Sequence, residues 1–203
     1  MITMKLLIIY HSGFGHTQVV AEHIRLGASR VLPDVHLLTT KEAMEQPQLL
    51  LEADTLVFGS PTYFGNVSAE FKQFMESTGS AWSRQLWKNK LAAGFTNSSS
   101  VNGDKLATLI SLSLFAAQHS MLWISLGMMP QYDEKGRQLP EHNGMASYLG
   151  LMTLSDNSHL EFHPPADLLS AELFGMRIAE ITLQVKSKEA VQPVNTLEHQ
   201  HNY

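Results

Sequence analysis

The feature that most constrains this chain is an apolar strand that runs directly into a loop of small residues and then into a helix. Leu6–Tyr10 is the apolar run, His11–Gly15 is the loop, and helical spacing begins near Thr17. Such a unit is typical of an open α/β sheet, where ligands bind beyond the carboxyl ends of the strands. The helix start presents backbone N–H groups and the positive end of the helix dipole, which favours a phosphate.

The composition of this first loop indicates how a phosphate would be held. Residues 6–24 contain no Lys or Arg, so backbone amides and the hydroxyls of Ser12 and Thr17 must bind the anion. Gly13 and Gly15 let the backbone take positive φ and approach the phosphate closely.

Two common nucleotide-binding loops do not fit this stretch. A P-loop needs Gly-Lys-Ser or Gly-Lys-Thr at a set spacing, and none follows. A dinucleotide-binding turn begins with Gly13-Phe14-Gly15, but Gln18 occupies the third glycine position and the next strand ends in Thr39-Thr40 without an acid. From this loop alone, the interpretation that it is a turn that binds nothing remains open. Two further loops of the same kind argue against that interpretation.

The rest of the chain alternates strands with helices. Strands are predicted at residues 5–10, 35–39, 55–60, 90–96 and 121–126, and helices at 17–30, 42–52 (interrupted by Pro47), 68–78, 104–119 and 166–185. Residues 127–165 lack periodicity, and an excursion of that length in a compact domain is usually functional. We expect one domain, residues 1–187, and a polar tail, residues 188–203.

This alternation predicts an α/β fold. The expected architecture is a doubly wound, five-stranded parallel sheet in the flavodoxin-like order 2-1-3-4-5, with helices on both faces. In that order strands one, three and four are neighbours. Each of them ends in a loop of small or hydroxyl residues, so we expect the three loops to converge on one site.

The second and third loops carry what a flat polar ring requires. Tyr63 and Phe64 can cover its face, and edge contacts can come from Thr62, Gly65, Asn97 and Ser98. A phosphate at one end and a flat ring at the other describe a mononucleotide, and FMN in particular. Without the neighbouring loops, Tyr63 and Phe64 would more simply be interpreted as residues that pack against the protein itself rather than against a ligand.

Composition narrows the class of protein. Of the 203 residues 44% are apolar, as in a globular domain, and a net charge of −5 without a basic run argues against nucleic acid and anionic membranes as partners. There is no cysteine, which excludes disulfides, thiolate metal sites and cysteine nucleophiles. No apolar run is long enough for membrane insertion and Met1 leads directly into a strand, so we expect a cytoplasmic protein.

The ten histidines do not favour a metal site. His159 and His163 are followed directly by two prolines, so no helix aligns them, and His199 and His201 lie in the tail. We therefore expect no bound metal. The serine run at 98–100 contains no G-x-S-x-G elbow, which argues against a serine hydrolase.

Three segments carry a resemblance to a known family. The most specific is Gly59-Ser60-Pro61-Thr62-Tyr63-Phe64-Gly65-Asn66, and the others are Ser12–Thr17 and Ser77–Trp82. Together they resemble the WrbA-type NAD(P)H:quinone oxidoreductases, which are flavodoxin-fold FMN enzymes. The resemblance covers about residues 5–126 and the last helix. It implies FMN as the cofactor and NAD(P)H as the electron donor.

The resemblance also implies which residues form the site. Residues 12–17 would cradle the FMN phosphate, 62–64 would line the isoalloxazine, and 97–102 would wrap the ribityl chain and ring. The expected substrate contacts are Phe14, His119 and Trp82, the last lying over the flavin where substrate enters. The full set of expected FMN contacts is Ser12, Gly13, Phe14, Gly15, His16, Thr17, Pro61, Thr62, Tyr63, Phe64, Gly65, Asn97, Ser98, Ser99, Ser100, Val101, Asn102 and Gln118.

The chain departs from the family pattern at several places. Phe14 stands where the family usually has Tyr, the loop Ser98–Val101 contains less Gly and Thr, and Gln118-His119 replaces a His-His pair. Residues 142–152 match a glycine-rich lid segment in place but not in sequence. The family's segment after strand two, which helps to build its tetramer, is shorter here. We expect a homodimer or a homotetramer.

The function expected from these residues is two-electron transfer from NAD(P)H to a quinone or a similar flat acceptor. The flavin would do the hydride chemistry, so no catalytic side chain beyond it is required. The alternative is an electron-carrier flavodoxin that shuttles single electrons between protein partners. Carriers commonly show a strongly acidic docking face, and a net charge of −5 is modest. A regulator that keeps the fold without enzymatic activity is a third interpretation.

Overall fold

The computed structural model describes residues 4–156 and 163–191. Its parallel sheet has the strand order β2-β1-β3-β4-β5, and a further strand, β6, pairs with β4. The strands are β1 (Lys5–Tyr10), β2 (Asp34–Thr39), β3 (Thr55–Pro61), β4 (Leu91–Ser98), β5 (Leu122–Trp123) and β6 (Leu151–Leu154). The predicted α/β fold and the flavodoxin-like order 2-1-3-4-5 are confirmed.

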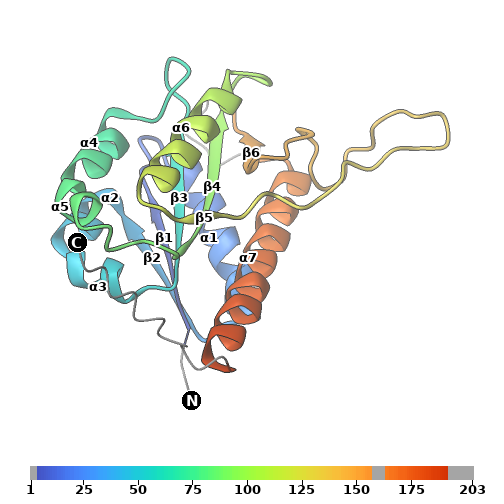
Figure 1. Cartoon of the computed structure of the whole chain (residues 1–203). Coiled ribbons are helices and arrows are strands. Elements are labelled where there is room, and N and C mark those ends of the chain that lie inside the picture. Colours follow the sequence, from blue (N-terminus) through green and yellow to red (C-terminus); the bar gives the residue numbers. More distant parts are fainter. Residues whose placement is uncertain (1–3, 157–162, 192–203) are drawn as a thin grey trace, which may run out of the picture.

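Helices cover both faces of the sheet (Figure 1). On one face lie α1 (His16–Ser29) and α7 (Pro165–Val191). On the other lie α2 (Thr40–Glu45), α3 (Pro47–Glu52), α4 (Ala69–Ser77), α5 (Gly79–Ser83) and α6 (Lys105–Gln118). This three-layer arrangement is the doubly wound one that the alternation of elements predicts.

The core is divided by the sheet into two apolar clusters. Leu6 and Ile8 of β1 pack toward α1 and α7, whereas Leu7 and Ile9 pack toward α4 and α6. Successive residues of a strand point to opposite faces, so a strand covered on both sides must be apolar throughout. This is why Leu6–Tyr10 reads as one unbroken apolar run.

Helix α1 is fixed in place by a close crossing with α7. A Cβ atom added at Gly27 would lie 1.9 Å from the backbone oxygen of Glu172, and one at Gly175 would lie 2.0 Å from that of Ile24. The two backbones therefore touch where side chains would keep them apart. The crossing lies in the last turns of α1 and fixes this helix against α7.

The weak helical pattern at 42–52 forms two short helices. Thr39 caps α2 by accepting the Glu42 N–H at 3.2 Å, and the Glu42 carboxylate accepts the Thr39 N–H at 2.8 Å. Pro47 occupies the first turn of α3, where its missing N–H costs nothing. The interruption predicted at Pro47 is confirmed.

The structure differs from the prediction around β5. Only Leu122 and Trp123 pair with β4, while the carboxyl half of β4 pairs with β6, a strand inside the excursion 127–165. Figure 1 shows the earlier part of that excursion, in yellow and orange, reaching away from the sheet before it returns. Two elements share one edge of β4, so neither forms a full-length strand.

The end of the chain also differs. Helix α7 continues to Val191, beyond the predicted helix end at 185. His159, His199 and His201, weighed above as metal ligands, lie outside the described residues, as does the predicted tail from 192 onward. None of the helices in the described ranges is long and apolar enough to cross a membrane.

Candidate functional site

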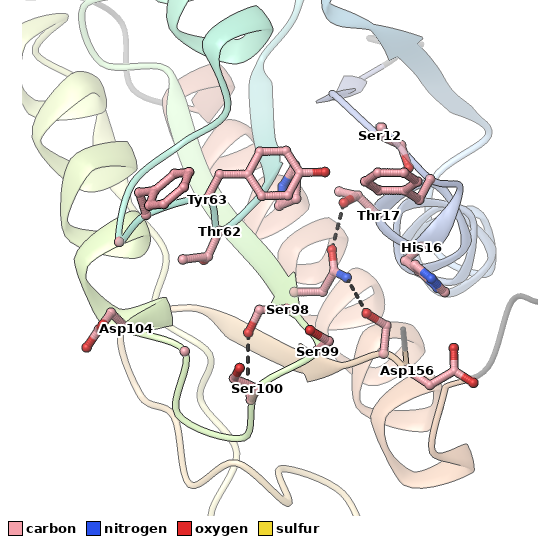
Figure 2. A pocket seen from close by; sticks show the side chains of 18 residues that line it. Ser12, His16, Thr17, Thr62, Tyr63, Ser98, Ser99, Ser100, Asp104 and Asp156 are labelled. Atoms are coloured by element: carbon pink, nitrogen blue, oxygen red, sulfur yellow. Dashed lines mark hydrogen bonds between the residues drawn. The ribbon is translucent and has the colours of Figure 1, made fainter. Parts of the chain in front are cut away.

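The three predicted loops converge on one pocket at the carboxyl edge of the sheet (Figure 2). Its volume is about 500 Å³, within the usual range for small-molecule sites. We call it the loop pocket. Its lining residues are Ser12, Gly13, Phe14, His16, Thr17, Pro61, Thr62, Tyr63, Phe64, Gly65, Asn97, Ser98, Ser99, Ser100, Gly103, Asp104, Ser155 and Asp156.

The first loop delivers a helix N-terminus to the loop pocket. Gly15 precedes α1 with φ 92°, a left-handed conformation that suits glycine. The first turn of α1 contains no acidic residue, and no Lys or Arg is among the described residues that line the pocket. The Ser12 hydroxyl accepts the Gln18 N–H at 3.3 Å. An anion here would therefore be held by amides, by hydroxyls and by the helix dipole.

Gly13 is required by its neighbour from the second loop. Figure 2 shows Tyr63 reaching across the pocket toward the first loop. A Cβ atom on residue 13 would lie 2.9 Å from the Tyr63 hydroxyl oxygen, so a larger residue would displace that ring. Partial burial raises the pKa of Tyr63, which keeps its phenol protonated at neutral pH.

The second loop is a tight turn that exposes an aromatic ring. Backbone hydrogen bonds join Tyr63 and Asn66 in both directions, at 2.9 and 3.1 Å. Phe64 and Gly65 both have positive φ, 49° and 73°, the pattern of a type I′ turn. A non-glycine residue in this region is strained, and such strain is concentrated at ligand sites. The turn leaves Phe64 fully exposed beside the pocket.

The third loop is tied to the first by buried hydrogen bonds. The Thr17 hydroxyl donates to Asn97 Oδ1 at 2.6 Å, and Asn97 Nδ2 donates to Ser155 Oγ at 3.1 Å. Thr17 and Asn97 are both buried. Their side chains therefore connect three loops to one another, and the Thr17 hydrogen is not directed at a ligand as the sequence suggested.

Thr62 has a similar structural use. Its hydroxyl lies 2.8 Å from those of Thr96 and Thr108 in a buried cluster. Its N–H donates to the backbone oxygen of Asn97 at 2.9 Å. Thr62 lines the pocket, but its polar atoms join the second loop to the third.

Sequence reasoning missed part of the lining. Gly103 and Asp104 follow the third loop, both with positive φ, and Ser155 and Asp156 follow β6. The carboxylates of Asp104 and Asp156 lie on opposite sides of the pocket and add negative charge to its lining (Figure 2). The signal for the last pair is present in the sequence, because Leu151–Leu154 followed by Ser155 repeats the strand-then-hydroxyl pattern of the other loops.

Several predicted contacts do not reach the loop pocket. Val101 and Asn102 lie in the third loop but outside the lining, and Gly15 of the first loop is also outside it, between the lining residues Phe14 and His16. Trp82, Gln118 and His119 instead border a separate hollow of about 400 Å³ between α4, α5 and α6, which we call the helix hollow. The reason is geometric. Helix α6 has 14 residues and starts at the loop pocket, so its carboxyl end lies about 20 Å away.

His119 is a packing residue in this structure. It is 1% exposed, it stacks on Trp87 with ring centroids 4.3 Å apart, and its Nε2 lies 3.0 Å from the Thr78 hydroxyl. Burial lowers its pKa to about 4. The predicted substrate contact is therefore not possible for this side chain as placed. Trp82 is half exposed and lies in a short helix, α5.

The predicted lid segment is also placed elsewhere. Asn143 donates through its side chain to the backbone oxygens of Met128 and Ser147, and its N–H donates to Ser170 Oγ on α7. No residue from 142–152 lines the loop pocket. The segment is anchored against α7 and leads into β6.

His163 lies beside His16 at the edge of the loop pocket. The rings meet edge to face with centroids 5.5 Å apart, and both residues are buried. Burial, together with the charge of His16, lowers the pKa of His163 to about 4. No group of three potential metal-ligating side chains occurs in the part of the chain that the structure describes.

Comparison with known proteins finds consistent relatives. Residues 4–130 match the family model for NADPH-dependent FMN reductases. Flavodoxin FldP of Pseudomonas aeruginosa is 35% identical over 89% of this chain and 98% of its own length. NAD(P)H dehydrogenase (quinone) 3 of Rhizobium meliloti is 25% identical, covering 93% of this chain and 97% of its own.

A solved structure is similar over the same length. It is described as a flavodoxin, WrbA-like protein from Agrobacterium tumefaciens. It superposes with a TM-score of 0.70 and 34% identity, over 90% of this chain and 99% of that one. The similarity therefore extends over most of this chain and nearly the whole of that one.

Proposed function

Because the chain belongs to the NADPH-dependent FMN reductase family, we propose that this FMN-dependent oxidoreductase passes two electrons from NAD(P)H to a quinone or a similar flat acceptor. The observation that carries the proposal is the loop pocket itself. A helix N-terminus whose first turn contains no acidic residue lies at one end, and three exposed aromatic side chains, Phe14, Tyr63 and Phe64, border the pocket.

The residues present fit FMN. Gly13 lets the Tyr63 hydroxyl approach the first loop, and Gly15, with φ 92°, turns the chain into the start of α1, where its backbone amides face a phosphate. We assign the phosphate to residues 12–17 and the ring to residues 61–65 and 97–100. Two helices begin at the pocket, α1 and α6, but the N-cap residue of α6 is Asp104. Helix α1 is therefore the better anion site, which suits a single terminal phosphate better than the pyrophosphate of FAD.

The protein's own part in the reaction is binding and orientation. When bound, FMN supplies the hydride chemistry. The amides of α1 neutralise the phosphate, and Tyr63 and Phe64 cover the ring and exclude water from its faces. Tyr63 keeps its proton at neutral pH because its pKa is raised, so it can donate a hydrogen bond but does not serve as a base.

Substrate contacts and assembly belong to the proposal as well. Phe14 is 66% exposed at the mouth of the pocket and can stack on a flat substrate. Trp82 can do so only if a second copy brings its helix hollow to the loop pocket. The exposed apolar residues of α6, Leu106, Ile110 and Leu114, support a homodimer or homotetramer. We also propose a single-domain cytoplasmic protein.

An electron carrier is the second candidate. It is favoured by the relative from Pseudomonas aeruginosa, which is named a flavodoxin and is 35% identical. A carrier would exchange electrons with protein partners and would not need NAD(P)H or a small acceptor. The two candidates share the FMN site and differ in turnover.

Titration of the FMN-free protein, followed by kinetics, tests the proposal. We expect binding near one FMN per chain and weaker binding of FAD, followed by quinone-dependent oxidation of NADPH or NADH. If neither flavin binds, the cofactor assignment is wrong. If FMN binds but neither NADPH nor NADH is oxidised in the presence of a soluble quinone, the carrier is the better description.

A further inference from the structure

A buried lysine lies inside the third loop of the loop pocket. Lys105 is the first residue of α6, and it is 0% exposed. Its ammonium donates to Ser98 Oγ at 3.0 Å and to the backbone oxygens of Ser100 and Val101 at 2.7 and 2.9 Å. The three hydrogens of an ammonium thus meet three acceptors, all from the loop that follows β4.

The position is an unfavourable one for a cation. The first turn of a helix carries the positive end of the helix dipole, and burial adds the cost of desolvation. The loop supplies the compensation, because its carbonyls turn inward to the ammonium. Gly103 closes the loop so tightly that an added Cβ would lie 2.4 Å from Ser98 Oγ. Lys105 and the loop therefore determine each other's conformation.

Three residues of this loop, Ser98, Ser99 and Ser100, line the loop pocket, and two of them bind Lys105. Ser98 Oγ also donates to the Ser100 oxygen at 3.0 Å (Figure 2). We propose that Lys105 is a positioning residue: its ammonium holds residues 98–101 in the shape that lines the pocket and thereby sets the affinity for FMN. This inference rests on the proposed FMN site.

The protonation state of Lys105 predicts a second measurable property, the dependence of FMN affinity on pH. Burial lowers the pKa of Lys105 to about 8, and the carboxylate of Asp167 on α7 acts in the opposite direction. Above that pH the neutral amine has two hydrogens for three acceptors, so one loop contact is lost. The FMN phosphate is already doubly ionised in this range, and the pKa of Tyr63 is raised above its ordinary value of 10. FMN affinity should therefore fall as pH rises through about 8.

The chain offers a matched control. Lys90 likewise donates its ammonium to backbone oxygens, those of Leu51 and Ala53, at the opposite end of β4. Lys105→Met and Lys90→Met each remove a partly or fully buried cation that donates to two backbone oxygens of a neighbouring segment. Only Lys105→Met acts on a loop of the pocket.

The test measures FMN dissociation constants by fluorescence titration of wild type and both variants from pH 6.5 to 9.5. At pH 7 we expect about a 10- to 100-fold loss of affinity for Lys105→Met, the scale of hydrogen bonds to a charged group, and less than about threefold for Lys90→Met. Wild type and Lys90→Met should lose affinity through about pH 8, while Lys105→Met should not change there.

The proposal is overturned if Lys105→Met binds FMN like the wild type. If Lys105→Met does not fold, Lys105→Gln takes its place: its amide keeps two hydrogens for the three acceptors, and FMN affinity equal to that of the wild type would again overturn the proposal. Amide exchange of residues 98–103 in the FMN-free protein separates the two proposals. Faster exchange in Lys105→Met than in Lys90→Met supports the positioning role even where FMN binding itself fails, and equal exchange refutes it.

Discussion

The loop pocket and the helix hollow lie at opposite ends of α6, and they are built in different ways. In the loop pocket the exposed groups are presented by backbone conformation: Gly15 and Phe64 have positive φ, and the ring of Phe64 is fully exposed. In the helix hollow the polar group is held by packing, since His119 is stacked on Trp87 and bonded to Thr78. The groups of the loop pocket are therefore available to a ligand, whereas His119 in the helix hollow is occupied by contacts within the protein.

The difference predicts which property each region controls. Changes to the backbone of the loop pocket should alter cofactor binding and leave the fold largely intact. Changes to His119 should alter the stability of the fold and its dependence on pH, without altering the FMN site directly. This distinction is wrong if changes in the loop pocket mainly alter the stability of the fold, or if changes to His119 mainly alter FMN affinity.

The largest effect should come from a charge at the start of α1. Gly15→Asp places a carboxylate where the phosphate is proposed to lie. Two unit charges 4 Å apart near a surface repel by about 4 kcal/mol, which corresponds to about a thousandfold loss of FMN affinity. The measurement is FMN titration monitored by fluorescence.

Two controls isolate that effect. Gly15→Asn has the same shape without the charge and tolerates positive φ, so it should retain most of the affinity. Gly79→Asp places the same carboxylate at the helix hollow, where an added Cβ meets nothing within 4 Å, and it should not change FMN binding. Equal losses for Asp and Asn at position 15 would mean that strain, not charge, excludes the flavin.

The sheet and the convergence of its loops could be predicted because they depend on local pattern. Each apolar run is a strand covered on both faces, and each is followed by a loop and a helix, which leaves few topologies. The pocket edge formed by Ser12–Thr17 and Pro61–Gly65 follows from that order alone. The strand-then-hydroxyl pattern at residues 151–155 is visible in the sequence, but the pairing of β6 with β4 could not be foreseen, because four residues within an irregular excursion pair with a strand far away in sequence.

Side-chain roles were less predictable than positions. Three predicted residues line the pocket as expected: Thr17, Thr62 and Asn97. Their side-chain hydrogen bonds, however, are made to other segments of the protein and join the loops to one another. Which acceptor a hydroxyl finds depends on neighbours 34 to 80 residues away, which spacing does not reveal. Trp82 and His119 were assigned to the pocket by resemblance, and the length of α6 separates them from it.

An intermediate effect should appear in the pH dependence of stability. His119 and His163 have pKa values lowered by burial from 6.5 to about 4, so the unfolded chain binds protons that the folded chain excludes between these values. Stability is therefore full above about pH 6.5 and is lost as pH falls toward 4. At pH 5 each histidine should lower the free energy of unfolding by about 2 kcal/mol relative to pH 7.

Urea denaturation of wild type and His119→Phe at pH 7 and pH 5 measures this dependence. Between pH 7 and pH 5, the free energy of unfolding of the variant should decrease by about half as much as that of the wild type. This holds whatever the stability of the variant at pH 7. Its FMN affinity at pH 7 should equal that of the wild type, since residue 119 does not line the loop pocket. A large loss of FMN affinity would show that the two regions are coupled through α6.

The smallest effect concerns Trp82, which is 48% exposed at the edge of the helix hollow. If assembly brings this indole to the loop pocket of another copy, Trp82→Ala removes a stacking surface worth about 0.5–1.5 kcal/mol and raises the KM for quinone about 2- to 10-fold. Trp82→Phe keeps a flat ring and should stay near wild type. FMN affinity should be unchanged in both variants, because residue 82 is outside the loop pocket.

A monomeric variant tests whether the contact is made between copies. In the α6 variant Ile110→Glu, once sedimentation shows it to be monomeric, the proposed role requires the KM effect of Trp82→Ala to vanish. An effect of Trp82→Ala that persists in that monomer would contradict a contact between copies. Loss of FMN with unchanged quinone kinetics would identify Trp82 as a packing residue.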